Sequence, residues 1–174
     1  IVPFPPGGPT DVMGRTAAKV MAEKLGQPFV VENKAGAGGN IGTEAVAKAA
    51  ADGYTIGLSA ISSLAIAPHL YASLPFNVEK DLLPISLVGT TPCALVIHPG
   101  APFSDLAGMV AHAKANPGRL SYATSGIGTS NHLAAELLVE SGFTVTGIDA
   151  RATQAPSSVH SAISVAGDRL NVPA

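Results

Sequence analysis

The sequence is poor in cysteine and aromatic residues, and it has no tryptophan. The single cysteine, Cys93, excludes a disulfide framework within the chain and a zinc site built from several cysteines. Aromatic residues make up 5% of the chain, so its apolar content comes mainly from alanine, valine, leucine and isoleucine. Such small aliphatic residues suit strands covered by helices better than an aromatic-rich β-sandwich.

Charged residues are also few, and neither sign predominates. Ten basic and twelve acidic residues are scattered over 174 positions, which leaves a net charge of −2. No basic block is present to follow nucleic-acid phosphates, so we expect no nucleic-acid partner. No apolar run approaches the roughly 18 residues of a membrane-spanning helix, so we expect the chain itself not to span a membrane. The sequence starts at Ile1 without a signal peptide, and we expect that an N-terminal piece was removed or is not included.

Short apolar runs alternate with helical patterns along the chain, which is typical of βαβ units and a mostly parallel sheet. In the expected helix over 10–25, Thr10 is the predicted cap and Gly26 the predicted end. The other predicted helices cover 40–50, 63–70, 104–115 (capped by Ser104), 132–140 and 157–166. The predicted strands cover 1–4, 29–32, 54–59, 85–91, 94–98, 120–124, 144–148 and 170–172.

Uncharged, glycine-rich loops follow a strand and open a helix at residues 5–10, 36–40 and 125–130. In the first loop, Gly7 and Gly8 lack Cβ atoms, so the backbone can approach a ligand closely, and Thr10 offers a hydroxyl donor. The positive end of the following helix dipole points towards this loop, which favours an anion there without any Arg or Lys. The same residues are also compatible with a plain strand-to-helix turn.

The loop at 125–130 repeats this pattern with three hydroxyls and two glycines before a helix. Its serine and threonine hydroxyls and its backbone N–H groups can donate to a carboxylate. A helix N-cap cluster is the alternative interpretation of the same residues.

Nucleotide and catalytic motifs are not matched. The loop at 36–42 carries Ile41 where a dinucleotide-binding fingerprint needs glycine, and Ala60 falls near the place of its acidic residue. No Gly-Lys-Ser/Thr follows any loop, and no G-x-S-x-G elbow is present. His132 and Glu136 share a helix face, but no third metal ligand is identifiable. We therefore expect no catalytic residues, metal or cofactor. An α/β enzyme that binds a phosphate or nucleotide at these loops, and a remnant that binds nothing, stay open as alternatives.

Several motifs occur together in a fixed order. They include VPFPPGGPTD at 2–11, VENKAGAGGNIG at 31–42, DGYT at 52–55, ANPG at 115–118, and SGIGT at 125–129 with His132. In order and spacing, from residue 1 to about 138, the chain resembles the Bug/TctC solute-binding proteins. These are the extracytoplasmic receptors of tripartite tricarboxylate transporters.

The resemblance implies an α/β, periplasmic-binding-protein-like (Venus flytrap) fold, whose two lobes close about a hinge over a carboxylate. We expect the first lobe at 1–91 and an incomplete second lobe at 92–174. The ligand-binding residues that the resemblance implies are Gly7, Gly8, Thr10 and Ser62 in the first lobe, and Ser125, Gly126, Gly128, Thr129 and His132 in the second.

The resemblance further implies a periplasmic receptor and not an enzyme. It would capture a small di- or tricarboxylate or an acidic amino acid and deliver it to the membrane permease subunits of the transporter. Two departures stand out. Residues 148–152 keep only the basic Arg151 of the Val-Pro-Tyr-Lys/Arg-Gly that the family usually carries there. The chain also stops short of the family's usual length, so we expect a fragment or a degraded gene.

Overall fold

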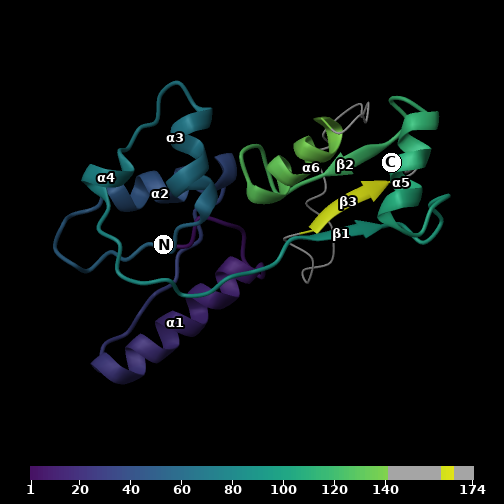
Figure 1. The fold of residues 1–174 in the computed structure, drawn as a ribbon. Coiled ribbons are helices and arrows are strands. Elements are labelled where there is room, and N and C mark those ends of the chain that lie inside the picture. Colours follow the sequence, from purple (N-terminus) through teal and green to yellow (C-terminus); the bar gives the residue numbers. More distant parts are fainter. Residues whose placement is uncertain (141–161, 167–174) are drawn as a thin grey trace, which may run out of the picture. The chain divides into compact units, whose positions relative to one another are not determined.

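The computed structural model describes residues 1–140 and 162–166 (Figure 1). The described residues fall into two compact units, the first at Ile1–Thr91 and the second at residues 92–140 and 162–166. Each unit combines extended segments with helices.

Three extended segments of the first unit pair with one another, and the segment that starts at Ile1 lies between the other two. Val2 forms a parallel bridge with Asn33, and its N–H donates to the Glu32 carbonyl at 2.8 Å. On the other side, the Leu58 N–H donates to the Ile1 carbonyl at 2.9 Å. The predicted strands 1–4, 29–32 and 54–59 therefore lie next to one another, but the pairing is too short to form a regular ladder. Pro3 is one reason, because proline has no N–H to donate.

The longest helix of the first unit, α1 (Pro9–Leu25), confirms the helix predicted at 10–25. Gly26 ends it in the left-handed conformation, with φ of 65°, and its N–H donates to the Ala22 carbonyl at 3.0 Å. The predicted cap is wrong, because the helix starts one residue before Thr10 and its N-cap is Gly8. Proline favours this earlier start, since its φ is already helical and its missing N–H would have no partner in the first turn.

The other helices of the first unit are shorter than α1. The helix predicted at 40–50 is shorter than expected, and the one at 63–70 is divided between two elements. The elements are η1 (Ala37–Gly39), α2 (Asn40–Ala47), the π-helical η2 (Ser62–Ile66), α3 (Ala67–Leu70) and α4 (Val78–Asp81). The strand predicted at 85–91 is wrong, and the Leu87 side chain within that segment is 80% exposed.

The second unit contains a mixed sheet with the order β1-β3-β2. Its strands are β1 (Ala94–Ile97), β2 (Ser121–Ala123) and β3 (Ala162–Ala166). β3 runs parallel to β1, with Ala94 opposite Ala162, and antiparallel to β2, with Tyr122 opposite Val165. The helix predicted at 157–166 is therefore wrong over 162–166. The strands predicted at 144–148 and 170–172 lie outside the described residues.

Two helices cover the core of the second unit, α5 (Leu106–Ala115) and α6 (Ser130–Glu140). Their apolar side chains pack with β2 in one cluster. The buried members are Phe103, Met109, Ala113, Leu120, Tyr122 and Ala135. The predicted cap of α5 is wrong by one residue, since Asp105, and not Ser104, accepts the Gly108 N–H at 2.7 Å. Within the described residues, no helix is long and apolar enough to cross a membrane.

Candidate functional site

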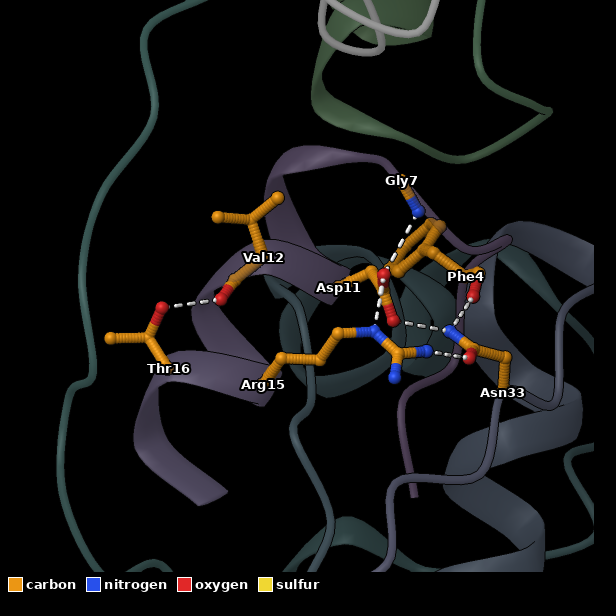
Figure 2. Close-up of polar contacts among 7 residues, drawn as sticks. All are labelled: Phe4, Gly7, Asp11, Val12, Arg15, Thr16 and Asn33. Carbon is orange, nitrogen blue, oxygen red and sulfur yellow. Dashed lines mark hydrogen bonds and ion pairs between the residues drawn. The ribbon is translucent and has the colours of Figure 1, made fainter. Parts of the chain in front are cut away.

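The first glycine loop is held in place by a buried carboxylate. Asp11, in the first turn of α1, is only 2% exposed. Its Oδ2 accepts the Gly7 N–H at 2.8 Å and the Arg15 Nε–H at 2.9 Å, and its Oδ1 accepts from Asn33 Nδ2 at 2.8 Å. Asn33 Nδ2 also donates to the Phe4 carbonyl at 2.9 Å. Figure 2 shows how these contacts connect the loop, the helix and the extended segment at Asn33.

These donors keep the carboxyl group of Asp11 ionised. The Arg15 hydrogen bond lowers the pKa of Asp11 most, and the bonds from Gly7 and Asn33 add to it. They outweigh the opposing effect of burial and bring this pKa from 3.8 to about 2. The loop therefore has a cation beside it, contrary to expectation, but the charge of Arg15 is balanced by Asp11.

The predicted ligand-binding residues of this loop differ in how much of their donor capacity is free. The Gly7 N–H is already bonded to Asp11. Gly8 is buried, and its carbonyl accepts the Val12 N–H at 2.9 Å. Thr10 is half-buried, and its hydroxyl has no partner among the described residues. Thr10 is therefore the side chain of this loop that can still donate.

The glycine-rich loop at 36–40 and the turn at Ser62 come together next to Phe4. The Ser62 hydroxyl, predicted to contact a ligand, donates to the Gly38 carbonyl at 2.6 Å. A Cβ on Gly39 would lie 3.0 Å from Ser63 Oγ and 3.3 Å from Phe4 Cζ, so only glycine leaves room for this contact. Two polar atoms near this contact are buried and have no partner within the described part of the chain. They are Ser63 Oγ and Oδ1 of Asn40, the residue that follows Gly39.

In the second unit, Thr129 is the cap of α6. Its hydroxyl donates to the Gly126 carbonyl at 2.6 Å and accepts the His132 N–H at 3.4 Å, while its carbonyl accepts the Leu133 N–H at 3.0 Å. Gly126 and Gly128 have φ of 133° and 79°, values that favour glycine. The helix N-cap interpretation of this loop is thus correct for Thr129, and its hydroxyl is already bonded on both sides.

We expect Thr129→Val to destabilise the fold, because valine keeps the shape of this 4% exposed side chain but loses the cap. The loss should be about 1 kcal/mol of unfolding free energy, measured by urea denaturation. Ser130→Ala, at the exposed next position, is the control and should change it by less than about 0.5 kcal/mol. Equal stability of Thr129→Val and wild type would contradict the capping role.

The remaining polar side chains of this loop gather at the start of α6. Ser125 Oγ donates to Asn131 Oδ1 at 2.9 Å, and Asn131 Nδ2 has no partner in the described residues. His132 Nε2 lies 3.7 Å from Glu136 Oε1, which also accepts the Tyr122 hydroxyl. Burial, followed by that hydrogen bond, raises the pKa of Tyr122 to about 12. His132 Nδ1 is buried without a partner within the described ranges.

The structure thus brings Ser125, Gly126, Thr129 and His132 together in one unit, and Gly7, Gly8 and Thr10 on one loop of the other. Within the described residues, no group of three or more His, Cys, Asp or Glu side chains is placed to hold a metal ion. Sequence reasoning missed Asp11 and Asn131 as parts of these sites. Asp11 stands within a quoted motif, but nothing local indicates that Asn33, 22 residues away, bonds to it.

Comparisons with known proteins give one consistent result. The family model of the tripartite tricarboxylate transporter family receptor, TctC, matches residues 13–155, a range that includes the loop at 125–130 and starts after the loop at 5–10. BugT of Bordetella pertussis is 50% identical over 138 residues, which are 79% of this chain and 42% of BugT. The chain therefore spans less than half the length of the curated relatives that it matches.

Solved structures agree with the family match. A structure titled R. palustris Rpa4515 with adipate matches with a TM-score of 0.72 and 30% identity, over 84% of this chain and 50% of that one. The periplasmic binding protein BugD matches with 0.70 and 35%, over 84% and 49%. MatC from Rhodopseudomonas palustris with bound malate matches with 0.68 and 30%, over 80% and 47%. The predicted α/β, periplasmic-binding-protein-like fold is confirmed.

Proposed function

The chain belongs to the tripartite tricarboxylate transporter receptor family, and from this premise we propose that it is part of a receptor for a small carboxylate. The observation that carries the proposal is the pair of loop–helix junctions, at Gly8–Thr10 and at residues 125–132, whose available hydrogen-bonding groups are mostly uncharged. Two structural neighbours are described with the dicarboxylates adipate and malate. We therefore place dicarboxylates first among the candidate ligands, ahead of tricarboxylates and acidic amino acids.

The physical basis is the polarity of a helix start. The first N–H groups of a helix have no acceptor inside the helix, and they carry the positive end of its dipole. A carboxylate at the start of α1 or α6 would supply the missing acceptor. Because the net charge of the Asp11–Arg15 pair is zero, binding at α1 relies on backbone N–H groups and the Thr10 hydroxyl.

We further propose the full set of ligand-binding residues implied by the resemblance. Gly8 and Thr10 have the strongest support in the first unit, since Gly7 and Ser62 make internal bonds. In the second unit, the bonds of Ser125 and Thr129 shape the loop, so we expect the ligand to meet backbone N–H groups and His132 there. The division of the lobes after residue 91 is also proposed, and the compact unit Ile1–Thr91 supports it.

The biological role that we propose is delivery of the bound acid, in the periplasm, to the membrane permease subunits of a tripartite transporter. Two findings support this role, namely membership of a receptor family and the similarity to the periplasmic binding protein BugD. They also support our proposal that the protein is not an enzyme. Calorimetry of the full-length protein against di- and tricarboxylates and acidic amino acids is the test. We expect saturable binding of at least one dicarboxylate, whereas silence across the panel would contradict the proposal.

Thr10→Val is expected to weaken carboxylate binding without changing stability. The hydroxyl has no partner in the described chain, so its loss removes a donor to the ligand and no bond of the fold. The dissociation constant should rise about fivefold to tenfold, by calorimetry. Thr16→Val is the matched control, because the Thr16 hydroxyl bonds to the Val12 carbonyl at 2.8 Å (Figure 2). Equal affinities of Thr10→Val and wild type would remove Thr10 from the site.

A further inference from the structure

Asn131 has the features of an unassigned ligand contact at the start of α6. It is the second residue of this helix, and it is only 3% exposed. Its Nδ2 is buried and has no hydrogen-bond partner among the described residues. The family motif quoted above, SGIGT followed by His132, does not include this position.

The side-chain amide of Asn131 is held in one orientation. Ser125 Oγ, at the start of the same loop, donates to Asn131 Oδ1 at 2.9 Å. This bond engages Oδ1 and leaves Nδ2 as the end of the amide without a partner in the described residues. An amide held by one atom presents its other end as a donor, since Nδ2 carries two hydrogens and cannot accept.

A buried donor without an acceptor is unfavourable, because the group has lost its hydrogen bonds to water and gained none. The adjacent His132 Nδ1 is likewise buried and unpartnered in the described residues. Two neighbouring side chains in the first turn of α6 thus have unused hydrogen-bonding capacity where the helix also presents free N–H groups. An oxygen-rich anion would satisfy the Asn131 Nδ2 donor and the helix N–H groups together.

We propose that Asn131 is a ligand-binding residue of this receptor, donating from Nδ2 to a carboxylate oxygen at the start of α6. Ser125 is its positioning residue, because it acts on the ligand through the amide. This assignment rests on the proposed function and deepens it. It makes the second unit's site selective for a group that only accepts hydrogen bonds.

Asn131→Asp tests this assignment with almost no change in shape. The substitution replaces the NH₂ donor with an oxygen that would face the ligand's carboxylate. We expect the dissociation constant for malate, measured by calorimetry on the full-length protein, to rise by about tenfold to a hundredfold. The melting temperature is measured beside it, because a carboxylate at this 3% exposed position loses hydration, whereas an acidic side chain in the first turn favours a helix. Loss of affinity together with unimpaired stability would separate a binding role from a structural one.

Asn77→Asp is the matched control. Asn77 is exposed and caps α4 with its side-chain oxygen, so the substitution adds the same charge and keeps the capping acceptor. It should leave malate binding within twofold of wild type. Asn131→Ser is the second variant, should the aspartate variant fold poorly. Serine keeps a shorter donor, and we expect a loss of affinity of about threefold to tenfold.

The outcomes separate this inference from the function on which it rests. Weaker malate binding by both Asn131 variants, with Asn77→Asp unchanged, supports the assignment. Wild-type binding of malate with equal binding by Asn131→Asp overturns the role of Asn131 and leaves the receptor function standing. A wild-type protein that binds no acid of the panel overturns both the receptor function and the role of Asn131.

Discussion

Replacing Asp11 with alanine should lower the unfolding free energy by about 2 to 3 kcal/mol. The carboxylate is buried and accepts from Gly7, Arg15 and Asn33, so its removal leaves three donors without their acceptor. The guanidinium of Arg15 is half exposed and can return to water, which limits the loss. The loop would also lose the bond from the Gly7 N–H that holds it against α1.

Urea denaturation gives the size of this effect, and Asp52→Ala is its control. Asp52 is exposed and, among the described residues, accepts only the Tyr54 N–H, at 2.9 Å, so removing its side chain should lower the unfolding free energy by about 0.5 to 1 kcal/mol. The pH dependence gives a second check. Because the pKa of Asp11 falls from 3.8 to about 2 on folding, the ionised group stabilises the fold above about pH 4.

That contribution should disappear as the pH falls from about 4 to about 2, and Asp11→Asn should flatten the stability profile in this window. If Asp11→Ala were no less stable than Asp52→Ala, or if Asp11→Asn kept the wild-type acid profile, the proposed role of the network would be wrong.

Gly42→Ala is expected to lower the unfolding free energy by about 3 kcal/mol. This is opposite to the usual effect in a helix, where alanine is more favourable than glycine. An added Cβ would lie 2.6 Å from the Pro3 Cα and 2.8 Å from the Lys34 carbonyl oxygen. Both atoms belong to the backbone, so neither can move aside by changing a rotamer. Gly42 thus allows α2 to pack directly on the extended segments beside the first glycine loop.

Gly14→Ala in α1 is the matched control for this substitution. A Cβ there would meet Val2 Cγ2 at 2.7 Å and Leu58 Cδ2 at 3.4 Å, which are side-chain atoms that have more freedom to adjust. Thermal and urea denaturation should therefore rank Gly42→Ala as clearly the less stable variant. The reverse order, or a stabilised Gly42→Ala, would show that α2 does not pack as closely as described.

The elements predicted best are those with local signals. Helix α1 (Pro9–Leu25) and its end at Gly26 follow from the apolar period and a glycine stop within one segment. Strands depend on partners elsewhere in the chain, and they were predicted less well. The sequence pattern predicts the end of a helix at β3 (Ala162–Ala166), although Ile163 and Val165 alternate with small residues and suit a strand between two others.

The candidate site divides in the same way. The loops at 5–10 and 125–130 were predicted from their glycines and hydroxyls, and the structure places both at helix starts. What was missed is the hydrogen bonding inside each loop. Asn33 reaches Asp11 across 22 residues, and no local pattern indicates such a contact. Ser125 and Thr129 look like ligand donors in the sequence, but their hydroxyls bond to Asn131 and Gly126.

The central proposal is that this receptor binds an acid through largely uncharged donors at a helix start and not through a cation of opposite charge. Calorimetry with malate and its uncharged diamide, on the same full-length protein, tests it most directly. We predict saturable one-to-one binding of malate and no measurable binding of the diamide, whose NH₂ groups would face donors of the protein. Equal binding of both compounds, or the absence of any bound acid, would contradict the account.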